Sequence, residues 1–280
     1  MHVVLALQDK TGDYSRHAGV TMQSVLENTK EQVCFHLFHD ETLSDKNKER
    51  FETLCADSGH LMRFHAISLP LAEDTLNAIK YLSMGTLYRL AIADQLEGID
   101  RAIYLDSDIV VTLDLADFYA MDVSDYSIAA VFDKGVQRNP RLYNRYFPVD
   151  LKKYFNAGVI LFNLAEIRKR HDLFRECMEL LQRYPKDPFT DQSALNAVLQ
   201  DECKMVDDRY NFVPNENSGL SEKKVWHFAG GYKPREARVY LRGANKNFFI
   251  VYVLGFLERF WRSRISFSVR WKYRAGGWRY

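Results

Sequence analysis

Short apolar runs alternate with longer mixed segments along most of this chain. A run such as Val3–Leu7 predicts a buried strand, and Ser44 and Thr190 are expected to cap the helices that begin at them. Strands that alternate with helices predict an α/β fold in layers. The expected strands cover residues 3–7, 33–38, 61–67, 101–105, 127–132 and 158–162, the expected helices cover 14–28, 44–55, 87–96, 166–183 and 191–199, and 134–154 is expected to be a long loop.

Two aspartates one residue apart follow one of these strands, in the stretch Tyr104-Leu-Asp106-Ser-Asp108. Successive side chains on a strand point to opposite faces, so both carboxylates fall on one face and can converge on a divalent cation. Val110 and Val111 stand where an EF-hand calcium loop needs an oxygen ligand and a glycine, which excludes that motif. Two alternatives remain: the nucleophile and acid/base pair of a phosphatase of the haloacid dehalogenase type, or an ordinary acidic turn.

Other polar residues stand where they can join this pair. Asp9 and Asp133 also follow expected strands, and ligands of α/β sheets bind at the carboxyl ends of strands. Near residue 230, the imidazole of His227 suits Mn²⁺-like ions, and Lys233 beside Gly230 can contact phosphate oxygens. A packed structural histidine is the alternative for His227. Together these residues predict a site for a metal and a polar substrate.

Composition and charge narrow the class of protein. The chain has 280 residues, of which 47% are hydrophobic, and a net charge of +1, so it can bury a large core and gives no general indication of nucleic-acid binding. The four cysteines are widely scattered, with no Cys-x-x-Cys pair, and no signal-peptide pattern begins at Met1. We therefore expect a cytoplasmic protein with reduced thiols.

The last 40 residues differ from the rest, and we expect two parts, 1–240 and a tail at 241–280. The segment 248–257 is apolar over ten residues, which is too short to cross a bilayer. Aromatic and cationic residues interleave after it, which favours insertion at the headgroup level of an anionic membrane. A helix packed on the catalytic part or on a second subunit is the alternative. The cations of the tail are Arg242, Lys246, Arg259, Arg262, Arg264, Arg270, Lys272, Arg274 and Arg279.

Five ordered motifs between residues 3 and 234 resemble glycosyltransferase family 8, and most closely its bacterial galactosyl- and glucosyltransferases of lipopolysaccharide or lipooligosaccharide synthesis. The resemblance implies a GT-A fold, a Rossmann-like mixed sheet flanked by helices, and retaining transfer of galactose or glucose from a UDP-sugar to a saccharide or glycolipid acceptor. The motifs are Thr86-Leu-Tyr88-Arg89-Leu90, Tyr104-Leu-Asp106-Ser-Asp108, Phe155-Asn156-Ala157-Gly158-Val159, Thr190-Asp191-Gln192-Ser193-Ala194-Leu195-Asn196 and His227-Phe-Ala-Gly230-Gly-Tyr-Lys233-Pro234.

The resemblance also implies a role for each matching position. Mn²⁺ or Mg²⁺ would be bound by Asp106, Asp108 and His227. The donor would be contacted by Ala6, Asp9 and Tyr14 at the nucleoside, by Ser107, Gly230 and Lys233 at the phosphates, and by Arg89 and Asn156 at the sugar. The catalytic positions would be Asp191, Gln192 and Asp133.

Retention of configuration admits two mechanisms: a double displacement through a covalent intermediate, or same-face attack in which the departing phosphate accepts the acceptor's proton. We predict same-face attack, with Asp191 mainly positioning the sugar. A sugar-nucleotide-binding protein without activity is the non-enzymatic alternative. The pair Asp207-Asp208 resembles both a phosphatase's late acidic pair and a family 8 loop, and we favour a structural role for it.

Overall fold

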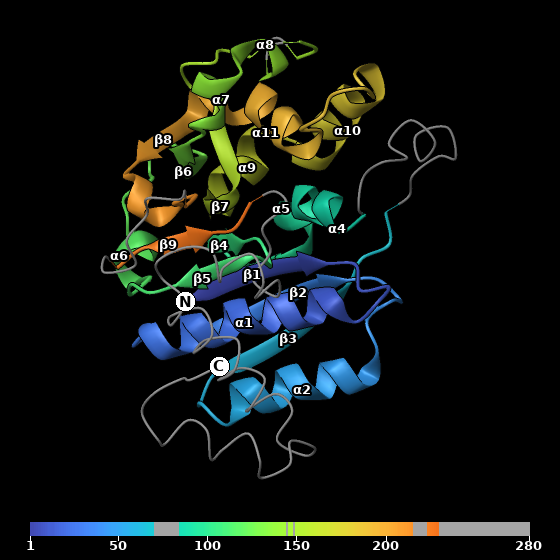
Figure 1. The fold of residues 1–280 in the computed structure, drawn as a ribbon, viewed down its shortest axis with the longest axis vertical. Helices are drawn as coiled ribbons and strands as arrows, with labels where there is room; N and C mark the ends of the chain where they lie inside the picture. The colour runs from blue at the N-terminus through green and yellow to red at the C-terminus, as the bar shows by residue number, and fades with distance from the viewer. Residues whose placement is uncertain (70–83, 144, 148, 215–222, 230–280) are drawn as a thin grey trace, which may run out of the picture.

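The computed structural model describes residues 1–69, 84–143, 145–147, 149–214 and 223–229. Its centre is a seven-stranded mixed sheet of order β3-β2-β1-β4-β7-β6-β8, beside a two-stranded sheet of β5 and β9 (Figure 1). The strands are β1 (His2–Leu7), β2 (Cys34–His39), β3 (Leu61–Ala66), β4 (Arg101–Leu105), β5 (Ile109–Val111), β6 (Ile128–Phe132), β7 (Phe155–Asn163), β8 (Cys203–Val206) and β9 (Val225–His227).

Helices cover both faces of the large sheet, which confirms the expected α/β architecture. Val3 and Phe35 pack on one face with Phe51 of α2, while Tyr104 and Ile160 belong to the core of the other face. Figure 1 shows α1 and α2 together on the same side of β1 and β2. The helices are α1 (Asp13–Asn28), α2 (Asp45–Ala56), α4 (Met84–Leu87), η1 (Tyr88–Ala91), α5 (Ile92–Gln95), α6 (Ala116–Tyr119), α7 (Gly135–Arg138), α8 (Pro140–Tyr143), α9 (Leu164–Arg170), α10 (Leu173–Arg183), α11 (Asp191–Leu199), η2 (Gln200–Glu202) and η3 (Asp208–Tyr210).

Strand direction decides where the polar residues meet. β3, β2, β1 and β4 are parallel, β7 is antiparallel to both β4 and β6, and β8 is parallel to β6. The carboxyl ends of β1, β4 and β6 and the amino end of β7 therefore lie along one edge. Residues that follow three of these strands, and residues that begin the fourth, are brought to that edge.

Two helices that the sequence predicts as continuous are broken. The expected helix 166–183 ends after α9 and restarts at α10, because Asp172 accepts a hydrogen bond from the backbone N–H of Arg175 as an N-cap (3.3 Å). The expected helix 87–96 contains the 3₁₀ turn η1. There the side chains of Tyr88 and Arg89 are buried and bonded outside the segment, Tyr88 to Asp40 (2.9 Å).

The two expected caps have different outcomes. The Ser44 hydroxyl accepts a hydrogen bond from the N–H of Asn47 (3.3 Å), which confirms that cap. Thr190 precedes α11 as expected, but its side chain makes no cap hydrogen bond and its φ is 44°. The Asp187 carboxylate instead accepts hydrogen bonds from the N–H groups of Phe189 (2.9 Å) and Thr190 (2.8 Å). Thr190 is therefore not a side-chain cap.

Some predictions lie at or beyond the limits of the described residues. The expected loop 134–154 contains the short helices α7 and α8. All four cysteines are free thiols, and three of them are buried. Within the described ranges, no helix combines the length and apolarity needed to cross a bilayer. The tail at 241–280, like Gly230 and Lys233, lies outside the described residues.

Candidate metal and donor site

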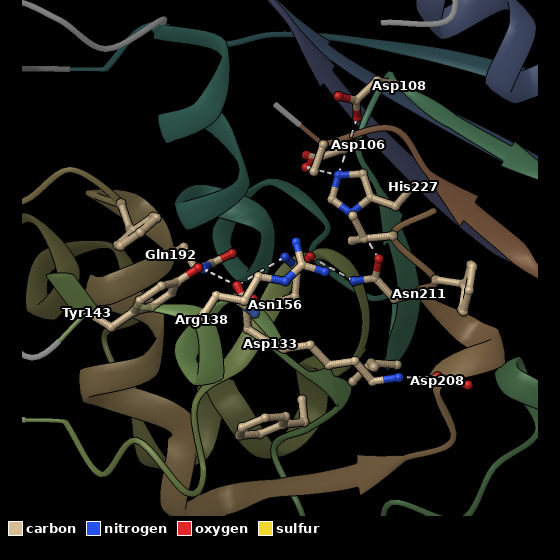
Figure 2. A pocket seen from close by; sticks show the side chains of 18 residues that line it. Asp106, Asp108, Asp133, Arg138, Tyr143, Asn156, Gln192, Asp208, Asn211 and His227 are labelled. Atoms are coloured by element: carbon tan, nitrogen blue, oxygen red, sulfur yellow. Dashed lines mark hydrogen bonds and ion pairs between the residues drawn. The ribbon is translucent and has the colours of Figure 1, made fainter. Parts of the chain in front are cut away.

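The two aspartates and the histidine of the sequence prediction meet at the end of β4. Asp106 and Asp108 follow β4, and the pairing of Ile109 with His227 brings the end of β9 beside them. The Nε2 atom of His227 lies 3.6 Å from Asp106 Oδ2 and 3.5 Å from Asp108 Oδ1 (Figure 2). Two carboxylates and an imidazole within 4.8 Å of one another fit a divalent ion of the Mn²⁺ type.

Arg89 connects the metal ligands with the start of α11. It is 5% exposed, and its guanidinium contacts Asp106 Oδ1 (2.9 Å) and Asp191 Oδ2 (3.0 Å) while donating a hydrogen bond to the carbonyl of Ala157 (2.7 Å). Its carbon Cζ lies 4.6 Å from the centre of the Tyr104 ring. A buried arginine with these partners fixes the orientation of both carboxylates.

The pKa shifts around Arg89 follow from this burial. Burial disfavours the charge of Arg89, but Asp106 and its other anionic neighbours outweigh that and raise its pKa. Burial also raises the pKa of Asp191, which Arg89 partly offsets. Tyr104 has a pKa well above its ordinary value because it is buried, so its hydroxyl keeps its proton and donates it to Asp106 Oδ1 (2.9 Å).

A chain of amide side chains leads from His227 to the other polar residues of the site. His227 Nδ1 lies 2.9 Å from Asn211 Oδ1, Asn211 Nδ2 donates to Asn156 Oδ1 (2.8 Å), and Asn156 Nδ2 lies 3.3 Å from Asp133 Oδ2. Because Asn156 Oδ1 also accepts from the N–H of Gly158 (3.0 Å), every amide in this chain has a defined orientation. His227 therefore donates with Nδ1 and turns the lone pair of Nε2 toward the aspartates.

Gln192 and Asp133 form the far side of the same site. Gln192 Oε1 accepts from the N–H of Ala157 (3.0 Å), so its amide nitrogen faces Asp133 Oδ2 (2.9 Å). The other oxygen of Asp133 accepts from the N–H of Gly135 (2.7 Å). Asp133 and Gln192 thus stand beside each other, as Figure 2 shows, with Tyr143 next to them.

Gly158 in β7 leaves the space that the His227 ring occupies. A Cβ atom at this position would stand 2.2 Å from His227 Cε1 and 2.7 Å from Nδ1. Real Cβ atoms do not approach other atoms so closely, so any larger residue must displace the ring. The glycine in the motif Asn156-Ala157-Gly158 is therefore required by contact with the metal ligand, because its backbone φ is not in the left-handed region.

Two cavities meet at the aspartates, with volumes of about 450 and 360 Å³. Asp106 and Asp108 belong to both, so a ligand bound at the metal site can extend into each. The larger cavity is also lined by Asp133, Arg138, Tyr143, Asn156, Phe189, Gln192, Asp208, Asn211 and His227, and the smaller by Ala6, Gln8, Thr11, Tyr14, His17, Thr86, Arg89, Tyr104 and Ser107.

Most candidate residues within the described ranges reach these cavities, but two do not line them. Asp9 is 4% exposed and accepts hydrogen bonds from Ser15 and from Asn47 Nδ2 (3.2 Å), so its carboxylate holds the loop before α1 together. Asp191 directs its carboxylate to Arg89 and is 6% exposed. Asp208 lines the larger cavity and pairs with Lys134, while Asp207 caps η3.

Sequence reasoning missed several residues of the site. Asn211 carries His227, Tyr104 carries Asp106, and His17 and Thr11 line the smaller cavity. Tyr104 stands two residues before Asp106 on a strand, and so on the same face, which was a usable signal. For Asn211 and His17 the sequence holds no comparable signal, because their partners lie far away along the chain.

The mixed sheet with a carboxylate–imidazole site at its edge defines a nucleotide-sugar transferase fold of the GT-A type. The galactosyltransferase LgtC, solved with donor and acceptor sugar analogues, has the same fold: its TM-score is 0.74 at 23% identity, covering 97% of this chain and 100% of that one. The model of the glycosyl transferase family 8 matches residues 2–236, and the chain belongs to that family.

Two curated relatives extend this comparison. General stress protein A of Bacillus subtilis is 27% identical over 84% of this chain and 87% of its own length. A lipopolysaccharide 1,2-glucosyltransferase of Escherichia coli is 29% identical over 77% of this chain. The chain spans 64% of the length of that glucosyltransferase, less than two thirds.

Proposed function

We propose that this protein is a retaining, metal-dependent hexosyltransferase that moves galactose or glucose from a UDP-sugar to a saccharide acceptor. The observation that carries the proposal is the convergence of Asp106, Asp108 and His227 at the junction of two cavities. A diphosphate bound at that junction would place its nucleoside on the side of Ala6 and Tyr14 and its sugar on the side of Asp133 and Gln192. Family membership favours this function over the phosphatase and over a non-enzymatic binding protein.

The chemistry requires that negative charge on the departing diphosphate be neutralised. A divalent cation at Asp106, Asp108 and His227 would supply Lewis-acid stabilisation of that charge. The chain's own residues hold the ligands in place: Arg89 and Tyr104 fix one oxygen of Asp106 and leave the other facing His227. This arrangement also disfavours the phosphatase hypothesis, in which Asp106 would have to attack a phosphorus atom.

Same-face attack remains our proposal for the retention of configuration. The buried carboxylate of Asp191 is engaged by Arg89, which suits a positioning residue better than a nucleophile. The amide of Gln192 is engaged by Ala157 and Asp133. The test is Asp191→Ala with azide as external nucleophile: no glycosyl azide is expected, and a glycosyl azide of inverted configuration would instead require a covalent intermediate on Asp191.

The reaction class is tested by UDP release from a panel of UDP-sugars, with Mn²⁺ and with EDTA. We expect one donor to turn over with metal only, and Asp108→Asn to lower the rate by at least 100-fold because it removes an anionic ligand. Asp114→Asn is a matched control, because its carboxylate accepts the N–H of Ala116 far from the cavities. No release from any UDP-sugar, with phosphate release from a phosphomonoester, would overturn the proposal.

The acceptor side is proposed on grounds of similarity and chemistry. Tyr143 and Phe189 stack at 4.0 Å on the wall of the larger cavity, and aromatic faces suit a sugar ring. A lipopolysaccharide core or another lipid-linked glycan fits the Escherichia coli relative. We also propose that residues 241–280 bind the cytoplasmic face of an anionic membrane. Deletion of these residues should abolish binding to anionic liposomes, and unchanged binding would refute the membrane role.

A further inference from the structure

A second group of metal-ligating side chains lies on the first two strands, apart from the donor site. His2 is in β1, and Cys34 and His36 are in β2. His2 pairs with Cys34 and Val4 pairs with His36 in the parallel register, so all three side chains lie on the face opposite α1 and α2. Their ligand atoms lie within 4.8 Å of one another.

The spacing of these atoms is close to that of a tetrahedral metal site. His2 Nδ1 and His36 Nε2 are 2.9 Å apart. In tetrahedral Zn²⁺ sites with bonds of about 2.0 Å to nitrogen and 2.3 Å to sulfur, neighbouring ligand atoms lie about 3.3–3.6 Å apart. Movements of side chains alone, by about 1 Å or less, are enough to reach that geometry, because paired strands already fix the three Cα positions.

Burial and an outer hydrogen bond prepare the ligands further. His36 is fully buried, Cys34 is 7% exposed and His2 is half-buried. His36 Nδ1 lies 2.9 Å from Nε2 of His65 in β3. When His36 donates this hydrogen bond, its Nε2 lone pair faces His2, which is the outer-shell support that metal-bound histidines generally have.

We propose that His2 Nδ1, His36 Nε2 and Cys34 Sγ bind a Zn²⁺-class ion, with water in the fourth position. Two imidazoles and a thiolate select Zn²⁺, and Co²⁺ as its spectroscopic substitute, over Mg²⁺ and Mn²⁺, which prefer oxygen. On binding, the Cys34 thiol releases its proton to solvent. The proton between the two rings moves to the outer nitrogen of His2, so both rings stay neutral and one proton leaves for each ion.

The position of this site indicates a structural role. His2 begins β1, whereas Ala6, at the far end of the same strand, lines the donor cavity. Four residues of strand separate them, or about 13 Å. An ion here would join the amino ends of β1 and β2, with His65 of β3 in its outer shell, and would stabilise three neighbouring strands that Figure 1 shows at one end of the sheet. Its occupancy is therefore independent of the proposed transferase activity.

The test is a Co²⁺ titration of the full chain without a polyhistidine tag, followed by absorption spectroscopy. We expect a thiolate-to-cobalt charge-transfer band with tetrahedral d–d bands, saturating at one ion per chain. Cys34→Ser should abolish the charge-transfer band, and His2→Gln should weaken Co²⁺ binding at least tenfold. Cys203→Ser is the matched control, because its thiol is free and lies outside the cluster. Asp108→Asn, which weakens the other candidate metal site, should leave the band unchanged.

Two results would overturn the proposal: no charge-transfer band in the wild-type chain, or a band that survives Cys34→Ser. Circular dichroism establishes that each variant is folded. If Cys34→Ser is not, the half-exposed His2→Gln variant decides, because it removes one ligand without emptying the core. In that case Zn²⁺ must raise the Tm of the wild type more than that of His2→Gln, and equal shifts would refute the site.

Discussion

At the scale of single residues, the metal site depends on side chains that would never touch the metal. Asn211 is 4% exposed, and it accepts the only proton that His227 can donate from Nδ1 if Nε2 is to face the aspartates. Asn211→Ala should therefore weaken Mn²⁺ affinity by about 10–100-fold, the usual cost of losing an outer-shell partner. Isothermal titration with Mn²⁺ measures it directly.

The control for Asn211 is an asparagine that also donates hydrogen bonds but lies away from the metal site. Asn163, at the opposite end of β7 from Asn156, donates to the carbonyls of Val123 (2.9 Å) and Tyr126 (3.2 Å). Asn163→Ala should lower the free energy of unfolding by about 1 kcal/mol but leave Mn²⁺ affinity unchanged. Equal loss of affinity in both variants would mean that Asn211 acts only through general stability.

Gly158 makes the second prediction at this scale. Because a Cβ atom would overlap the His227 ring, Gly158→Ala should displace the ring and lower Mn²⁺ affinity at least tenfold. The effect should be absent when His227 has already been replaced, so Gly158→Ala added to His227→Ala should cost little more than His227→Ala alone. Additive losses in that double-mutant cycle would show that Gly158 acts elsewhere.

At the scale of elements, strands were easier to predict from the sequence than helix ends. Buried strands are continuous apolar runs, so Val3–Leu7 and 101–105 were readable from local pattern alone. The breaks at His171 and within 87–96 were not, because they depend on distant partners: Arg89 turns toward Asp106 and Asp191 rather than along a helix. The short strands β5, β8 and β9 form only by pairing with distant segments, and no local pattern indicates them.

Glu202 ties several elements together and gives a prediction about pH. Its carboxylate accepts a hydrogen bond from Ser127, just before β6, and lies 3.5 Å from Arg170 at the end of α9. Burial acts to raise the pKa of Glu202, but the hydrogen bonds from Ser127 and His171 and the charge of Arg170 lower it overall below the ordinary 4.5.

The sign of the effect follows from that lowered pKa. The unfolded chain binds the proton more readily, so the contribution of Glu202 is complete above pH 4.5 and is lost as the pH falls through the folded-state pKa. At neutral pH, Glu202→Gln should lower the free energy of unfolding by about 1 kcal/mol. This difference from the wild type should shrink on acidification below pH 4.5. Denaturant unfolding at a series of pH values measures it, and a difference independent of pH would contradict the assignment.

At the scale of the whole molecule, strand order assembles the site from segments that are distant in sequence. The rule that ligands bind at the carboxyl ends of strands predicts from the sequence alone that Asp106, Asp108 and Asp133 lie together. The same rule suggests Asp9, whose carboxylate is engaged in the loop before α1. Position at a strand end predicts the neighbourhood of a side chain, whereas its direction depends on loop packing. The resemblance to family 8 added His227, which only the pairing of β5 with β9 brings to the aspartates.

Because the two cavities meet only at Asp106 and Asp108, donor and metal binding should be coupled across the whole fold. UDP alone has two phosphates facing two carboxylates, and their repulsion disfavours binding until a cation neutralises it. We therefore expect UDP to raise Tm only in the presence of Mn²⁺. At 100 times its Kd the ligand should add about 2.7 kcal/mol to the free energy of unfolding. Asp108→Asn should abolish the joint shift, and Cys34→Ser, distant from both cavities, should retain it. Equal stabilisation by UDP with Mn²⁺ and with EDTA would place the nucleotide away from the aspartates.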